Sequence, residues 1–206
     1  MALYAHRQRF ARLSTALGSA LAGLPLSANG WTLLGVGAAV ATAFALARGR
    51  LLGAALLYGL SGLCDLIDGA VARQRGTASA RGAYLDTLAD RLSEGAALFG
   101  LLLVPLPPLG LEAHHWLFLY LFLSLMVTYA KAAASEKGLV EKEFGGGGWL
   151  ERPERVIILS AGMLAGGLRL RLVTLTLALL TILAAASLLQ RVRLVLAEHA
   201  RSQGRS

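Results

Sequence analysis

Six apolar stretches, each close to the length of a membrane-crossing helix, make up most of this chain. The hydrocarbon core of a bilayer is about 30 Å thick, so a helix needs roughly 20 apolar residues to cross it. In lipid every backbone polar group must be paired within the protein, which only helices and closed barrels achieve. Six segments are too few to close into a barrel, so we expect helices. The stretches run over residues 30–46, 51–70, 83–106, 115–134, 156–168 and 172–189. The sequence therefore predicts an all-α integral membrane protein with six transmembrane helices.

The charge balance favours a membrane protein over a nucleic-acid-binding protein. Charged residues are 16% and hydrophobic residues 56% of the chain, whereas soluble domains carry about 25% charged residues. The net charge is +8, and most Lys and Arg fall on one side of the membrane if the N-terminus is cytoplasmic. Cytoplasmic loops have this bias. We therefore expect a multi-pass protein of the cell membrane, with both termini cytoplasmic and no nucleic-acid partner.

The first residues predict an amphipathic helix that lies on the membrane surface. Leu3, Phe10 and Leu13 recur at helical spacing, and arginines lie between them, which is typical of interfacial helices. We therefore divide the chain into an interfacial segment over residues 1–28, a six-helix transmembrane domain over residues 29–196 and a cytoplasmic tail over residues 197–206.

All four aspartates lie within 26 residues, inside or at the ends of the second and third expected helices. A carboxylate in a membrane costs several kcal/mol unless it is compensated, so each is a functional candidate. Asp65 and Asp68 are spaced i,i+3, and Asp86 and Asp90 are spaced i,i+4, so each pair shares a helix face. The short connection makes the two helices antiparallel neighbours with the pairs at matched depths. We therefore expect the four carboxylates to converge near the cytoplasmic ends of these two helices and to form the active site there.

Converging carboxylates need a countercharge, because each disfavours the ionisation of the others. Oxygen ligands without His or Cys favour Mg²⁺, Mn²⁺ or Ca²⁺ over zinc. Four carboxylates can hold two ions, and paired ions about 4 Å apart are common in enzymes that catalyse displacement at phosphorus. The neighbouring residues fit a phosphate ligand, since Gly69 and Gly82 allow a close approach to the backbone and Arg73 offers a fork of donors.

The stretch over residues 65–90 reads DLIDGAVARQRGTASARGAYLDTLAD and follows the pattern D-x2-D-G-x2-A-R-x8-G-x3-D-x3-D at every fixed position. This pattern resembles the signature of the CDP-alcohol phosphotransferases, the integral membrane enzymes of phospholipid head-group synthesis. The six expected spans and the interfacial helix are similar to that family as well. The segment PLSANGWT resembles the family's P-N-x-x-T element, although Pro25 is separated from Asn29.

The resemblance implies a CDP-activated lipid, either CDP-diacylglycerol or CDP-archaeol, whose pyrophosphate binds two metal ions, Mg²⁺ or alternatively Mn²⁺. Asp65, Asp68 and Asp86 would hold the first ion, and Asp86 and Asp90 would reach the second. Asp90 would also be the catalytic base that takes a proton from the acceptor hydroxyl. That oxygen would attack the phosphorus bearing the lipid, and CMP would leave. Family members are typically homodimers, which implies a second copy as a partner.

The same resemblance implies contacts with the CDP-lipid. The positions that match those of the family, or flank its acids, are Asn29, Thr32, Gly69, Arg73, Ser79 and Gly82.

The acceptor is predicted from basic residues, because an anionic acceptor needs cations. The candidates are Lys131, Arg152, Arg155 and Arg191. The segments YAKAAASEKG and ERPERVIIL resemble those of the phosphatidylinositol phosphate and archaetidylinositol phosphate synthase branch, in which basic residues from these places hold a sugar phosphate. We therefore expect inositol 1-phosphate as acceptor. Plain positive-inside topology also predicts basic residues here.

Two alternatives stay open at this point. Within the family, glycerol 3-phosphate or another head-group alcohol is the alternative acceptor. Outside it, an ion-coupled transporter would also carry intramembrane acids. A transporter predicts acids spread over the membrane depth and interrupted central helices, whereas the acids here cluster at one depth.

Overall fold

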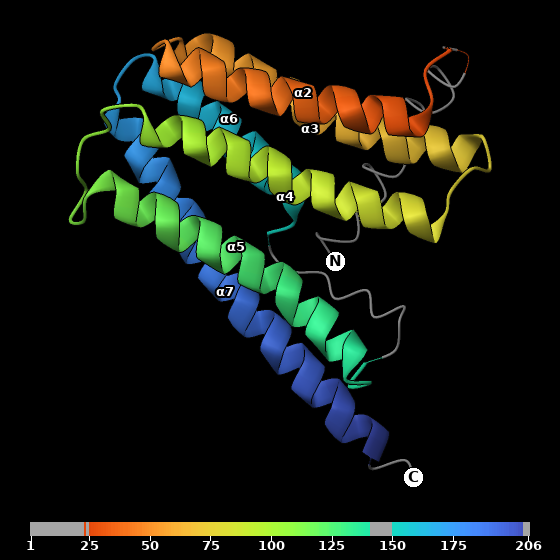
Figure 1. Cartoon of the computed structure of the whole chain (residues 1–206). Helices are drawn as coiled ribbons and strands as arrows, with labels where there is room; N and C mark the ends of the chain where they lie inside the picture. The colour runs from red at the N-terminus through yellow and green to blue at the C-terminus, as the bar shows by residue number, and fades with distance from the viewer. Residues whose placement is uncertain (1–22, 24, 141–149, 204–206) are drawn as a thin grey trace, which may run out of the picture. The chain divides into compact units, whose positions relative to one another are not determined.

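Helices account for the regular elements of the described residues, which are 23, 25–140 and 150–203 of a computed structural model (Figure 1). Each expected apolar stretch falls largely on one of them, so the all-α prediction is confirmed. The interfacial helix expected over residues 1–28 lies almost entirely outside the described part of the chain. The helices are α2 (Ala28–Ala47), α3 (Leu51–Gln74), α4 (Ala80–Leu102), α5 (Ala113–Glu136), α6 (Arg152–Gly166) and α7 (Arg171–Gln203).

Four of these helices are long and apolar enough to cross a membrane, namely α2, α3, α5 and the part of α7 up to Ala200. The helix α6 has only 15 residues, and α4 carries several charged side chains. Large apolar side chains also point outward, including Leu56 and Phe118 at 67% exposed and Ile182 at 62%. Lipid, rather than water, suits such a surface.

The chain divides into two compact units, Met1–Gly100 and Leu101–Ser206. In the first unit α2 and α3 run side by side (Figure 1). They pack closely at Gly35, where an added Cβ would lie 3.1 Å from the Cβ of Cys64. Small residues let membrane helices pack closely, and Gly35 leaves no room for a methyl group without a small shift of its neighbours on α3.

The end of α3 is built by the glycine that follows it. Gly76 has a φ of +65°, a conformation that glycine adopts without steric cost. The amide of Gly76 bonds to the carbonyl of Arg73 at 3.2 Å, and that of Thr77 bonds to Ala72 at 2.9 Å. This pair of bonds is the Schellman motif, which closes a helix. The chain therefore reverses within residues 75–79 and starts α4.

In the second unit α7 packs against both α5 and α6 (Figure 1). The contact with α6 is tight at Gly162, where an added Cβ would lie 2.4 Å from Oγ1 of Thr176. The segment before α5 is held by hydrogen bonds to its carbonyls. Thr174 of α7 donates to Pro107 at 2.8 Å, and the indole of Trp116 donates to Leu109 at 3.0 Å.

Candidate functional site

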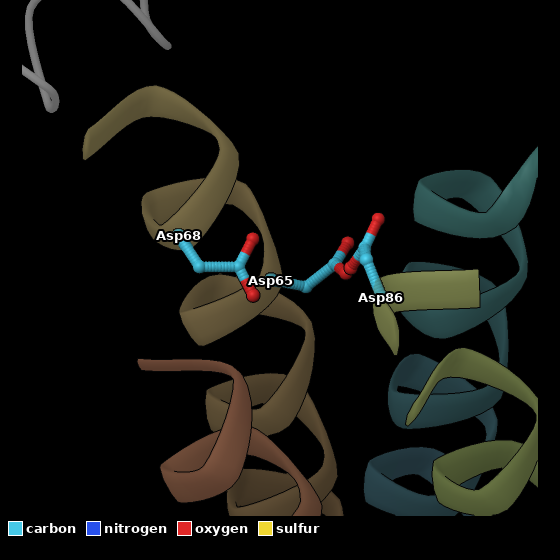
Figure 2. Close-up of side chains that lie close together, drawn as sticks. All are labelled: Asp65, Asp68 and Asp86. Atoms are coloured by element: carbon cyan, nitrogen blue, oxygen red, sulfur yellow. The ribbon is translucent and has the colours of Figure 1, made fainter. Parts of the chain in front are cut away.

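Three aspartates from two helices bring their carboxylates together (Figure 2). Asp65 and Asp68 lie on α3 and Asp86 lies on α4, and one carboxylate oxygen of each falls within 4.8 Å of the others. Asp68 is only 5% exposed, and the other two are half-buried. Asp90, one turn further along α4, is half-buried and is not part of this group.

The chemistry of this acid cluster, Asp65, Asp68 and Asp86, fits a hard divalent cation. All its ligand atoms are carboxylate oxygens, the type that Mg²⁺, Mn²⁺ and Ca²⁺ prefer. Negative charges this close together in a partly buried place repel one another unless a cation lies between them. The helix faces predicted from the i,i+3 spacing thus meet as a cation site requires.

The helix α2 supplies a hydroxyl to this cluster. Oγ1 of Thr32 donates to Oδ2 of Asp68 at 2.5 Å. The start of α2 is set by Ser27, whose Oγ accepts the amide N–H of Gly30 at 3.2 Å, which is the usual N-cap bond. Arg75, just past α3, donates to the carbonyl of Leu26 at 3.0 Å. These contacts hold the first turns of α2 beside the acids.

Arg73, predicted to contact the CDP-lipid, lies over Gly69 on the same helix. A Cβ at position 69 would lie 3.2 Å from one terminal nitrogen of the guanidinium. The missing side chain of Gly69 thus leaves room for Arg73. Ser79 and Gly82 interact with each other, because the Ser79 hydroxyl accepts the Gly82 amide at 3.1 Å and caps α4. Asn29 is exposed in the first turn of α2.

Two of the predicted acceptor-binding arginines are anchored inside the second unit. Arg155 on α6 is 6% exposed, and its guanidinium donates to the hydroxyl of Ser124, which is fully buried on α5. Arg191 on α7 donates to the carbonyl of Val127 on α5 at 2.9 Å.

The other two predicted basic residues are more accessible. Lys131 is exposed near the end of α5, and Arg152 is half-buried at the start of α6. All four basic residues belong to the second unit, and the acid cluster belongs to the first. Sequence reasoning missed Ser124, because one hydroxyl in an apolar helix has no pattern that distinguishes it from an ordinary packing residue.

Glu94 has a structural partner rather than a place in the acid cluster. Its carboxylate and the guanidinium of Arg91 lie 2.7 Å apart, with side chains 5% and 16% exposed. The two residues are spaced i,i+3 on α4, so one helix face carries the pair. This pair neutralises two charges within the apolar part of α4.

Known proteins with similar sequences include phosphatidylinositol phosphate synthases and an archaetidylinositol phosphate synthase. The phosphatidylinositol phosphate synthase of Mycobacterium tuberculosis is 37% identical over 162 residues, covering 76% of this chain and 71% of that protein. The archaetidylinositol phosphate synthase of Methanothermobacter thermautotrophicus is 39% identical over 145 residues, covering 69% of each chain.

Solved structures agree with this relationship. The crystal structure of the M. tuberculosis phosphatidylinositol phosphate synthase with CDP-DAG bound has a TM-score of 0.71 and 30% identity, covering 89% of this chain and 94% of that one. The structure of the same enzyme with manganese and citrate has a TM-score of 0.71, 30% identity and 88% coverage of both chains. The family model described as CDP-alcohol phosphatidyltransferase matches residues 26–199. With its aspartate motif and acid cluster, the chain therefore belongs to the CDP-alcohol phosphatidyltransferase family.

Proposed function

We propose that this membrane transferase moves a phosphatidyl-type group from a CDP-activated lipid to a hydroxyl of inositol 1-phosphate and releases CMP. The observation that carries the proposal is the acid cluster of Asp65, Asp68 and Asp86, whose oxygens lie within 4.8 Å of one another. Relatives named phosphatidylinositol phosphate synthase, at 37% identity, support inositol phosphate as the acceptor.

The acid cluster is proposed to hold Mg²⁺, and Asp90 to reach a second ion together with Asp86. A relative crystallised with manganese supports a divalent metal. Such ions, when bound, neutralise charge on the pyrophosphate and on the departing CMP. The carboxylates on α3 and α4 would hold these ions, which would supply the positive charge that an anionic diphosphate needs in order to bind beside the acids.

We assign Asp90 as the general base of the transfer. Its carboxylate takes the proton from the acceptor hydroxyl, and the hydroxyl oxygen attacks the phosphorus that bears the lipid. The bond between that phosphorus and the CMP oxygen breaks, so CMP leaves with the electron pair. Asp90 is half-buried one turn from Asp86, which supports a place beside the reacting phosphate.

The CDP part of the lipid is proposed to lie along the start of α2 and the turn between α3 and α4. Arg73 is suited to the pyrophosphate, because its guanidinium has a fork of donors and the room above Gly69 lets it lie against the helix. The other proposed contacts, taken from the family motif, are Asn29, Thr32, Ser79 and Gly82.

The acceptor phosphate is proposed to bind Lys131, Arg152, Arg155 and Arg191. Positive-inside topology needs only that cationic side chains lie on the cytoplasmic side, in contact with water or head groups. Arg155 is 6% exposed and bonded to Ser124, a costly placement for a charge that serves topology alone. This burial favours an anion-binding role for Arg155.

The topology of the family is proposed for the whole chain. It comprises an interfacial segment over residues 1–28, a transmembrane catalytic domain of six spans over residues 29–196, and a tail over residues 197–206, in a homodimer. Both termini and the active site would be cytoplasmic, with α4 and α6 completing the spans. The bias of basic residues supports this orientation. Accessibility of single introduced cysteines in intact cells, in a Cys64→Ser background, tests it.

The decisive test is an acceptor screen with purified protein, CDP-diacylglycerol or CDP-archaeol, and Mg²⁺. We expect CMP release with inositol 1-phosphate, loss of release with EDTA, and recovery on adding Mg²⁺ or Mn²⁺. Asp65→Asn should abolish turnover, whereas Glu136→Gln, which changes an exposed carboxylate on α5, should not. Turnover with glycerol 3-phosphate alone would redirect the acceptor assignment, and turnover with free serine but neither phosphate would refute a phosphorylated acceptor.

A further inference from the structure

The hydroxyl of Thr32 has two possible acceptors and one proton. Its Oγ1 lies 2.5 Å from Oδ2 of Asp68 on α3 and 3.2 Å from the carbonyl oxygen of Ala28, one turn earlier on α2. A hydroxyl donates one hydrogen bond, and a bond to an ionised carboxylate is shorter and stronger than a bond to a neutral carbonyl. The hydroxyl of Thr32 therefore donates its hydrogen bond to Asp68.

Other threonines of the chain show the usual behaviour of this side chain in a helix. Thr42, on the same helix, donates to the carbonyl four residues earlier at 2.9 Å. Thr176 and Thr181 on α7 do the same at 2.8 Å each. At Thr32 this distance is 3.2 Å, within a range that reaches 3.5 Å at Thr128. The feature that sets Thr32 apart is its second and much shorter contact, 2.5 Å to Asp68 on α3.

The surroundings keep this contact short. Gly35, one turn after Thr32, lets α2 approach α3 until a Cβ there would lie 3.1 Å from the Cβ of Cys64. Asp68 is 5% exposed, so little water competes for its carboxylate. A hydrogen bond in such an environment is stronger than the same bond in water.

We propose that Thr32 is a positioning residue for Asp68, whose carboxylate it orients before a divalent cation binds. The family motif implies a contact between Thr32 and the CDP-lipid; this role is a different one. It deepens the proposed metal role of Asp68 and rests on it. Hydrogen-bond partners of metal ligands typically contribute about 10- to 100-fold to metal affinity.

The test measures Mn²⁺ affinity of the purified full-length chain, without CDP-lipid or acceptor, from the electron paramagnetic resonance signal of free Mn²⁺. Thr32→Val, which removes the hydroxyl and keeps the shape, should weaken Mn²⁺ binding by about 10- to 100-fold. Thr32→Ser, which keeps the hydroxyl, should stay within a few-fold of the wild type. The matched control is Thr42→Val on the same helix, which should leave the affinity unchanged.

The outcomes separate this inference from the proposed function. If Asp68→Asn weakens Mn²⁺ binding and Thr32→Val does not, the positioning role is wrong while the metal role stands. If Thr32→Val binds Mn²⁺ normally but has a raised KM for the CDP-lipid, the positioning role is also wrong, and Thr32 contacts the substrate instead. If Asp68→Asn leaves the affinity unchanged, the metal role fails and the inference falls with it. Should Thr32→Val not fold, Thr32→Ala removes the same hydroxyl without added bulk.

Discussion

Replacing Gly69 by Ala should separate catalysis from folding, because the space above this residue is occupied by the side chain of Arg73. The new Cβ would lie 3.2 Å from the nearest guanidinium nitrogen and 3.7 Å from the other. The nearer nitrogen must therefore move by a few tenths of an ångström, which costs little at the end of a flexible side chain. Alanine also favours a helix over glycine by up to about 1 kcal/mol. The free energy of unfolding should therefore be unchanged or raised by up to about 1 kcal/mol, roughly 2–4 °C in Tm.

Activity should respond in the opposite direction. If Arg73 grips the pyrophosphate from above Gly69, its displacement weakens a charge-assisted hydrogen bond, a type that contributes about 1.5–3 kcal/mol. Complete loss of that bond would correspond to about a 100-fold decrease in kcat/KM for the CDP-lipid, so we expect a decrease of up to that size. The assay is CMP release at varied CDP-diacylglycerol, with Tm measured on the same preparations. Gly53→Ala is the matched control, since it lies on α3 and its added Cβ meets nothing within 4 Å.

Two results would refute this reasoning. Full kcat/KM in Gly69→Ala would mean that the position of Arg73 above Gly69 has no role in binding the CDP-lipid. A large fall in Tm for Gly69→Ala, without one for Gly53→Ala, would mean that the guanidinium is held too rigidly to move aside.

Three further substitutions test the packing that supports the site. Gly162→Ala should destabilise by about 1–3 kcal/mol, because its Cβ would lie 2.4 Å from Thr176 Oγ1; Tm should fall, Thr176→Ala should restore part of the loss, and an unchanged Tm would contradict the tight α6–α7 contact. Glu94→Ala should destabilise by about 1.5–3 kcal/mol, because it removes a hydrogen-bonded ion pair with the half-buried Arg91, whereas replacing both residues by Met should recover most of that loss in a chemical-denaturation series. Gly35→Ala should push α2 from α3 and weaken Mn²⁺ binding in the direction of Thr32→Val; equal affinity would show that the helix spacing tolerates a methyl group.

The class of protein and the motif could be read from residue spacing alone. Apolar length predicts the helices because lipid leaves no other partner for the backbone. The i,i+3 spacing of Asp65 and Asp68 predicts a shared face because helical geometry is periodic. The ends of the helices follow equally local rules, as at Gly76, whose positive φ closes α3. The family assignment rests on the same short-range pattern.

The approach of the acids on α3 and α4 was predicted from spacing and a short connection, but the other contacts between helices were beyond such reasoning. Nothing near Thr32 in the sequence indicates that its hydroxyl points to Asp68, 36 residues away, and the motif assigns it to the lipid instead. The sequence likewise gives no sign that Arg155 bonds to Ser124, 31 residues away. Residue spacing alone was enough to predict which helix faces carry charge, because side chains repeat with the helical turn. It placed the helix ends only within several residues, and α7 continues to Gln203, well past the apolar stretch that predicts it. The remaining helix–helix contacts came from the folded structure, because they depend on where small residues such as Gly35 and Gly162 let two helices pack closely.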